Sequence, residues 1–152
     1  MKINTVQFGE VEINEDDIIT FPKGIIGFPK YNKYVLLNAD ESGESPFLFL
    51  QSVEEPELDF LILNVFKHYP QYDFDMNESL VAEIELEGPK DAFVCTIVTV
   101  RDTLANATTN LKAPVVINQT KKIGVQFVLD NKRYEIKHPI TEGLLQKTGG
   151  EH

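Results

Sequence analysis

The residues best suited to acid–base or metal chemistry are His68, Asp73 and Asp75, which lie close together in the chain. Asp73 and Asp75 flank Phe74, so in an extended segment both carboxylates lie on one face. Imidazole and carboxylate groups in such a cluster can bind a divalent metal or transfer protons. The chain has only three histidines, and paired acids also keep a loop soluble. The spacing therefore favours a solvated loop over a metal site.

Other catalytic chemistry finds little support in the sequence. The single cysteine, Cys95, lies in the apolar run 93–100 with no histidine nearby, which predicts a packed thiol rather than a nucleophile. One cysteine also excludes an intramolecular disulfide and zinc sites with two or more cysteine ligands. The Gly-x-Ser-x-Gly, Walker, Gly-x-Gly-x-x-Gly and His-Glu-x-x-His motifs are absent. We therefore expect no catalytic site, no metal and no cofactor.

The segment 66–76 concentrates aromatic side chains around Pro70 in what should be a loop. Large rings anchor protein interfaces because they bury much area at little cost in side-chain entropy. In a small β domain they can equally fold back over the core. Both interpretations stay open at this point. The candidate partner-binding residues are Phe66, Tyr69, Tyr72 and Phe74, together with Glu41 and Glu44 of the acidic loop 40–44.

The net charge of −10 is divided unevenly, with −13 in residues 1–88 and +3 in residues 89–152. Such acidity is typical of a solvated surface, and its functional alternative is a basic partner. Direct nucleic-acid binding is disfavoured because phosphates require a clustered positive face, and the pairs Lys121–Lys122 and Lys132–Arg133 are small. The chain also has no apolar stretch approaching the roughly 20 residues of a membrane span. We therefore expect a cytoplasmic protein, monomeric and not bound to membranes.

The elements that must position these residues are short stretches of alternating apolar and polar residues, which predict strands. Frequent Gly, Pro and Asp breakers separate them, so the sequence predicts an all-β, small antiparallel β-barrel-like domain over residues 1–148. The run 93–100 is expected to be its central strand. At most one or two short helices are expected, one of them within 140–147, and residues 149–152 should form a flexible tail. The predicted strands are 2–8, 11–13, 33–38, 47–52, 60–65, 80–86, 93–100, 115–118, 124–129 and 133–137.

Four motifs go beyond these general properties. They are Phe-Pro-Lys-Gly-Ile-Ile-Gly-Phe at 21–28, Phe-Leu-Gln-Ser at 49–52, Thr-Asn-Leu-Lys-Ala-Pro-Val-Val-Ile-Asn at 109–118 and Gly-Val-Gln-Phe-Val-Leu at 124–129. In sequence, order and spacing they closely resemble the FliW family of flagellar assembly factors. The resemblance runs from about Gln7 to Pro139, and the stretch 110–118 is its most specific part.

Each motif also has a purely structural interpretation. Glycines at 24 and 27 suit a tight turn that sends the flanking phenylalanine rings into the core. A proline at 114 can open a strand where no ladder donor is needed, and asparagines at 110 and 118 can bond to nearby backbone. The motif residues expected to act as scaffold are Phe21, Gly24, Gly27, Phe28, Asn110, Leu111, Pro114 and Asn118.

The resemblance implies a non-enzymatic cytoplasmic protein that binds flagellin and also binds and antagonises CsrA, an RNA-binding translational repressor. Flagellin would occupy the protein until it is exported, after which the free protein would capture the repressor. Two other classes remain open from the residues alone. One is a β-barrel that binds oligosaccharide or single-stranded nucleic acid through aromatic side chains, and the other is a hydrolase with paired carboxylates.

Overall fold

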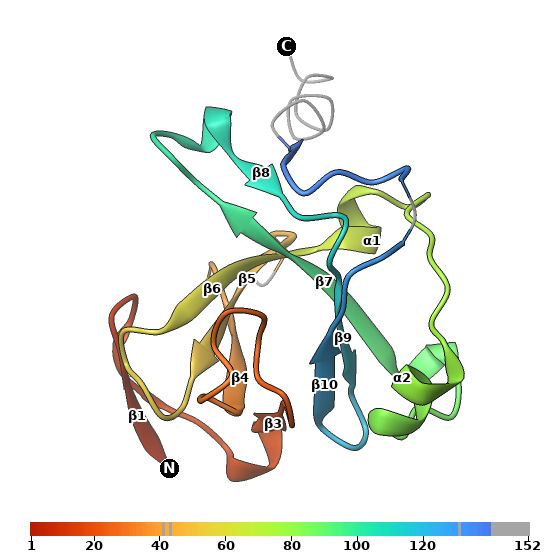
Figure 1. Ribbon diagram of the computed structural model, residues 1–152. Coiled ribbons are helices and arrows are strands. Elements are labelled where there is room, and N and C mark those ends of the chain that lie inside the picture. The colour runs from red at the N-terminus through yellow and green to blue at the C-terminus, as the bar shows by residue number, and fades with distance from the viewer. Residues whose placement is uncertain (41, 43, 131, 141–152) are drawn as a thin grey trace.

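The computed structural model describes residues 1–40, 42, 44–130 and 132–140, and their secondary structure is mainly strand (Figure 1). The strands are β1 (Lys2–Thr5), β2 (Gly9–Glu12), β3 (Ile19–Thr20), β4 (Lys33–Asn38), β5 (Phe47–Ser52), β6 (Asp59–Asn64), β7 (Ala92–Thr99), β8 (Thr108–Thr109), β9 (Val115–Asn118), β10 (Ile123–Gln126) and β11 (His138–Pro139). The helices are α1 (Val65–His68) and α2 (Glu78–Glu83), with short 3-10 turns at Glu15–Asp17, Pro89–Asp91 and Leu104–Asn106. None of the helices in this part of the chain is long and apolar enough to cross a membrane.

Seven strands close into a barrel. Around it the order is β7-β6-β5-β4-β3-β10-β9, and β9 pairs back onto β7. Each of these pairs is antiparallel except β3–β10, which is parallel and has the single pair Thr20↔Ile123. Closure of this kind removes most of the unpaired strand edge that an open sheet would expose. The predicted all-β, antiparallel, barrel-like fold with at most one or two short helices is confirmed.

β7 is the strand that closes the barrel. One of its edges pairs with β6 over residues 95–97. The other edge pairs with β9 over residues 92–95 and then, through Val98 and Thr99, with β8, which lies outside the barrel. The prediction of a central strand at 93–100 is therefore confirmed, with the strand shifted by one residue.

The barrel interior is filled by large apolar side chains, among them Phe21, Tyr34, Leu50 and Ile62, which are fully buried. Gly124 of β10 lies directly against the ring of Phe21. A Cβ built on Gly124 would be 2.5 Å from a carbon of that ring. The absence of a side chain at this position therefore lets β10 approach the turn that follows β3.

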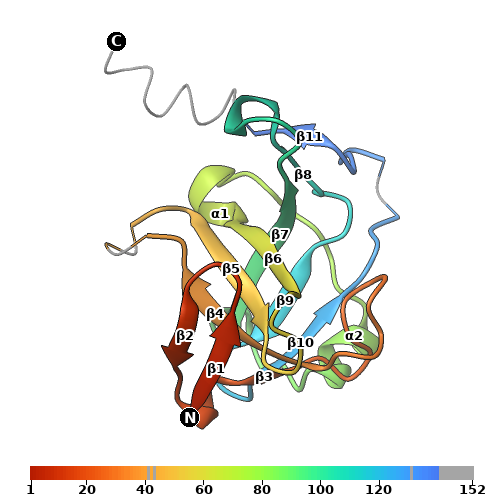
Figure 2. The same ribbon diagram turned by 90° about the vertical axis from the view of Figure 1, so that its left-hand side faces the viewer.

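Two further layers cover outer faces of the barrel. The β1–β2 hairpin places Ile3 against Val35 of β4. Elsewhere, α2 and the segment 69–86 pack over β7, β9 and β10, where Ile84 and Val116 belong to one buried cluster. Figure 2 shows the hairpin and α2 on opposite sides of the molecule. Of the aromatic candidates, Tyr69, Tyr72 and Phe74 belong to this second layer.

The predicted strand at 80–86 is wrong, because these residues begin within α2. The side chain of Asn77 caps the helix by accepting a hydrogen bond from the N–H of Leu80 at 2.9 Å. Apolar residues at 80, 84 and 86 fit either period, since positions four apart share one face of a helix. The N-cap at Asn77 favours the helix over the strand. Capping by asparagine is a local sequence signal that the alternation of apolar and polar residues does not include.

The predicted strand at 133–137 is also wrong, since no strand forms before β11 at His138–Pro139. Here the alternation does not match the burial, since Ile136 is 59% exposed, and the loop is held by a backbone bond from Leu111 N–H to the Glu135 carbonyl, at 3.1 Å. The first strand ends at Thr5, short of the predicted Phe8, because the Thr5 hydroxyl accepts the Phe8 N–H at 2.8 Å and forms a turn.

The prediction of a helix at 140–147 and of a tail at 149–152 concerns residues beyond 140, which lie outside the described residues. The single domain over 1–148 stays a prediction.

The turn 21–28 agrees with its predicted geometry except at one residue. Gly24 and Gly27 have φ values of +69° and +94°, and Phe21 is fully buried. Phe28 was expected in the core, which is wrong: its side chain is 40% exposed and its ring lies edge-on to Phe60, with centroids 5.3 Å apart. Ile25 fills the core position instead, because the tight bond from Phe28 N–H to the Ile25 carbonyl turns the chain back toward solvent.

Gly24→Ala should destabilise the protein more than Gly9→Ala does. Both glycines have nearly the same φ, +69° and +67°, but a Cβ at 24 would lie 2.5 Å from the Phe28 carbonyl oxygen whereas one at 9 meets nothing within 4 Å. The left-handed backbone should cost about 1 kcal/mol in either variant, and the collision about 1–3 kcal/mol more in Gly24→Ala. Urea denaturation measures both free energies of unfolding, and equal losses would show that the turn at 24 relaxes freely.

Candidate interaction site

The aromatic segment is folded onto the barrel around Tyr72, which is only 5% exposed. Its ring centroid lies 4.7 Å from that of Tyr134, 5.4 Å from Phe74 and 6.0 Å from Phe66. The Tyr72 hydroxyl donates a hydrogen bond to the Leu111 carbonyl at 2.6 Å. Burial, and to a smaller extent the neighbouring Tyr134, raises the pKa of Tyr72 well above its ordinary value. Tyr72 is therefore a packing residue of the outer layer.

The other three aromatic candidates are more accessible. Phe66 is 42% exposed. Tyr69 is half-buried, donates to the Pro139 carbonyl at 3.1 Å and has its ring 5.3 Å from that of His138. Phe74 is also half-buried, with its ring 5.8 Å from Phe127. Their burial ranks Phe66 first as a surface anchor, and a binding role for any of the four stays a prediction.

Of the acidic candidates, Glu44 lies in the β4–β5 connection, beside the start of the aromatic segment. Glu44 is exposed, and its backbone carbonyl accepts a hydrogen bond from the Lys67 ammonium at 3.2 Å. Glu41 lies outside the described residues. Glu44 is thus exposed close to Lys67, the residue that follows Phe66 in the aromatic segment.

The residues considered for catalysis do not form a site. His68 is buried, whereas Asp73 and Asp75 are exposed. Across the described residues, no group of three or more histidine, cysteine, aspartate or glutamate side chains could hold a metal ion. Cys95 is fully buried in the barrel, and burial raises the pKa of its thiol. The prediction of a packed thiol at Cys95 is confirmed.

The asparagine side chains of the motifs bond to nearby backbone, as expected from the sequence. Asn118 Oδ1 accepts the N–H groups of Thr120 and Lys121, at 3.0 and 3.1 Å, and its Nδ2 donates to the carbonyls of Ile84 and Glu85, at 2.9 and 3.0 Å. Asn118 therefore ties the end of α2 to β9. The link to Ile84 crosses 34 residues, so no local pattern could have revealed it.

The remaining motif residues also have structural roles. Asn110 Oδ1 accepts the N–H groups of Lys112 and Ala113, both at 3.1 Å. Leu111 is buried in the outer cluster, and Pro114 is buried immediately before β9. These contacts confirm the expected local bonds and the expected opening of a strand at Pro114.

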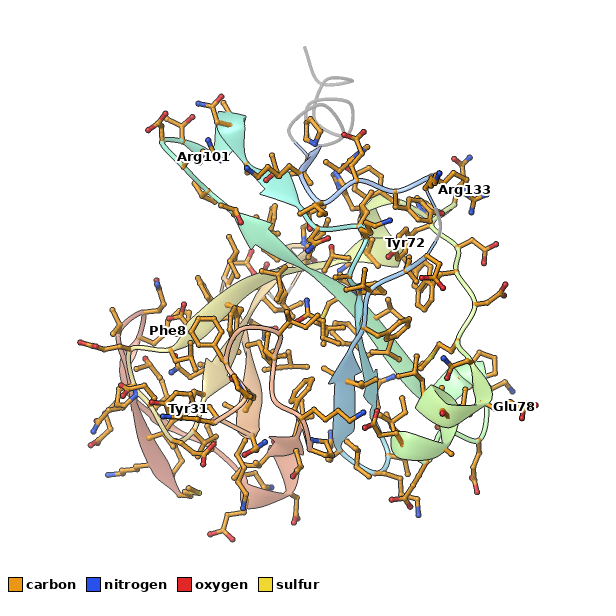
Figure 3. All side chains as sticks on the ribbon, in the orientation of Figure 1. Phe8, Tyr31, Tyr72, Glu78, Arg101 and Arg133 are labelled. Carbon is orange, nitrogen blue, oxygen red and sulfur yellow. The ribbon has the colours of Figure 1, made fainter. Side chains whose placement is uncertain are left out.

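A groove of about 760 Å³ separates α2 from residues 127–130, and sequence reasoning did not identify it. Its apolar lining includes Met76, Leu80 and Leu129, and its acidic lining includes Asp75 and Asp130. Figure 3 marks this side of the molecule by Glu78 on α2, far from Arg101 on the β7–β8 connection. The lining residues of the groove are dispersed in the sequence, at 23, 75–83 and 127–130, and only the fold brings them together.

Together, the fold and these surfaces define a closed β-barrel with an added aromatic layer and a groove that both apolar and acidic side chains line. The sequence model of the FliW protein family matches residues 2–140. The chain is 42% identical to a flagellar assembly factor FliW from Alkaliphilus metalliredigens over 144 residues, which is 95% of this chain and 88% of the relative. It is 38% identical to that of Geobacillus thermodenitrificans over 138 residues, covering 91% and 94% of the two chains.

A solved structure agrees with the sequence comparisons. A crystal structure of the flagellar assembly factor FliW superposes with a TM-score of 0.85 and 38% identity, covering 92% of this chain and 96% of that one. This chain belongs to the FliW family of flagellar assembly factors. The predicted family resemblance is confirmed.

Two buried tyrosines give opposite expectations for removal of a hydroxyl. Tyr72→Phe leaves the Leu111 carbonyl without its donor and should destabilise the protein by about 1–3 kcal/mol. The Tyr34 hydroxyl has no hydrogen-bond partner among the described residues, and burial raises the pKa of Tyr34 to about 12. Tyr34→Phe should therefore be neutral or stabilising by up to about 1 kcal/mol. Chemical denaturation of the two variants tests the pair, and a larger loss for Tyr34→Phe would contradict it.

Proposed function

We propose that this protein binds flagellin and, when free of flagellin, binds and antagonises the translational repressor CsrA. In this role it is a non-enzymatic, monomeric protein of the cytoplasm that couples the synthesis of flagellin to its export. The match of residues 2–140 to the FliW family carries the proposal. A flagellar assembly factor needs a flagellar protein as partner, and flagellin is the one whose supply must follow assembly.

The distribution of charge supports a basic second partner. Residues 1–88 carry a net charge of −13. Within them, Asp75 and Glu78, which lie beside and on α2, are exposed. An RNA-binding repressor must carry positive charge to hold phosphates. The acidic surface would accelerate its encounter with this protein and repel RNA phosphates once the two are bound.

The mechanism is partner exchange. While unexported flagellin is abundant, it occupies the protein and the repressor stays free to silence flagellin messenger RNA. When export removes flagellin, the protein captures the repressor and translation resumes. The scheme requires that the two partners bind with an unfavourable coupling free energy, either by overlap or by a change of conformation.

Titration of CsrA into the preformed complex with flagellin should displace flagellin or bind with reduced affinity. Linkage requires that flagellin be weakened by CsrA by the same factor. Isothermal titration calorimetry measures both orders of addition. A stable ternary complex with undiminished affinities would rule out exchange while leaving family membership intact.

The association rate with CsrA should fall as salt rises, because exposed charges are largely screened beyond a Debye length of about 10 Å at 0.1 M salt. Reversing Glu41 and Glu44 to lysine should lower the association rate at low salt and leave the dissociation rate nearly unchanged. Stopped-flow fluorescence over a salt series measures both rates. If salt and charge reversal leave the association rate unaltered, electrostatic steering is not part of the mechanism.

A further inference from the structure

The barrel is incompletely paired where β3 meets β10. β3 has only two residues, Ile19–Thr20, and pairs with β10 at Ile123 alone. On its other edge β10 pairs with β9 along its length, and the pairing continues with bonds from Phe127 N–H to the Pro114 carbonyl and from Leu129 N–H to the Lys112 carbonyl. Within the described part of the chain, the residues beyond Ile123 therefore pair with another strand on one edge only.

Val128 presents the open edge. Because Phe127 and Leu129 direct their N–H groups toward β9, the N–H and carbonyl of Val128 point the opposite way, as alternation along an extended chain requires. Among the described residues neither group makes a backbone hydrogen bond, and the residue is 59% exposed. An exposed donor and acceptor on an extended segment form a template for another strand.

The groove described above runs beside this edge. Residues 127–130 line one side of it, and Met76, Leu80 and other residues of the α2 region line the other. Apolar side chains in the groove can receive alternate side chains of an added strand, while the Val128 backbone supplies its hydrogen bonds. The edge and the groove therefore suit one extended peptide segment.

The charges of the groove select a basic occupant. Asp75 and Asp130 line it and form no ion pair in the described part of the chain, and Arg133 lines the adjoining pocket with both of them. The lining cation Lys23 is paired with Glu83 at 3.0 Å, so its charge is offset. The exposed acids at 78, 85 and 87 lie in or just after α2 and add to the negative field. An acidic or phosphate-bearing occupant would be repelled.

We propose that the groove between α2 and residues 127–130 docks an extended basic segment of a partner protein, which pairs as an added strand with the open edge at Val128. The inference rests on the proposed function, since a basic RNA-binding repressor is the partner with this chemistry. It assigns that partner to one face of the molecule, away from both the β1–β2 hairpin and the β7–β8 connection (Figures 2 and 3).

The test uses the full-length protein and purified CsrA. Hydrogen exchange of backbone amides, followed by NMR, should show exchange at Val128 slowed by about tenfold or more in the complex, because an added strand accepts this N–H. Val128→Pro removes the donor and should weaken binding by about tenfold, whereas Val128→Ala keeps the donor and should change it by less than about threefold. Circular dichroism checks that each variant is folded.

Charge reversal provides a second, independent variant. Asp130→Lys should weaken binding by about threefold or more at low salt. Asp102→Lys is the matched control, because Asp102 is also exposed and its substitution changes the net charge by the same amount. Asp102 is next to Arg101, which lies far from α2 (Figure 3). If the two reversals weaken binding equally, binding depends only on the net charge of the protein, and the assignment to the groove is overturned.

The outcomes separate the inference from the function on which it rests. If CsrA binds with Val128 unprotected and with Asp130→Lys as tight as wild type, the docking site is wrong while the proposed function stands. Protection of Val128 by flagellin alone also overturns the inference, because the edge then belongs to another partner. If CsrA does not bind the free protein, both the proposed function and the inference fail.

Discussion

Closure of the barrel depends on the pairing of β7 with β9, two strands that stand apart in the order of the sheet. β7 joins β6 to β9, and that double pairing turns a meander of strands into a closed barrel. The side chains on one face of β7 point into the barrel, and those on the other face pack under the outer layer. Cys95 lies in the barrel core, while Val94 lies in the cluster beneath α2. Because successive residues of a strand point to opposite faces, loss of register at β7 would disrupt the barrel and the outer layer together.

Closure is weakest where the chain departs from this regularity. β3 supplies two residues to the barrel, and Gly124 brings β10 against Phe21 rather than against a full neighbouring strand. Gln126 compensates in part: its side chain accepts the Ile26 N–H at 3.0 Å and donates to the Ala113 carbonyl at 3.1 Å. Side-chain bonds thus hold the turn 21–28 to β10 where ladder bonds are lacking. The open backbone beyond this point is the direct consequence of a short β3.

Sequence patterns located the long strands well, because burial on one or both faces fixes the order of apolar residues. The strands at 33–38, 47–52 and 115–118 were predicted with the same bounds that the structure has. Two-residue strands such as β8 carry no periodicity and were missed. The burial of Tyr72 depends on Leu111, 39 residues away, so composition alone left its role undecided. The groove was invisible for the same reason, since its two sides come from separate parts of the chain.

The outer layer is the part of the molecule best suited to transmit information between partners. The barrel is tied by continuous ladders, whereas the segment 69–86 is held mainly by side-chain packing and by a few bonds such as those from Asn118 and Tyr72. Elements with few backbone bonds to the rest of a fold shift at lower cost than its core strands. The aromatic cluster, α2 and the groove all belong to this layer. A partner bound to one of them can therefore alter another without opening the barrel, which gives coupling between partners a physical route even if their contact surfaces are separate.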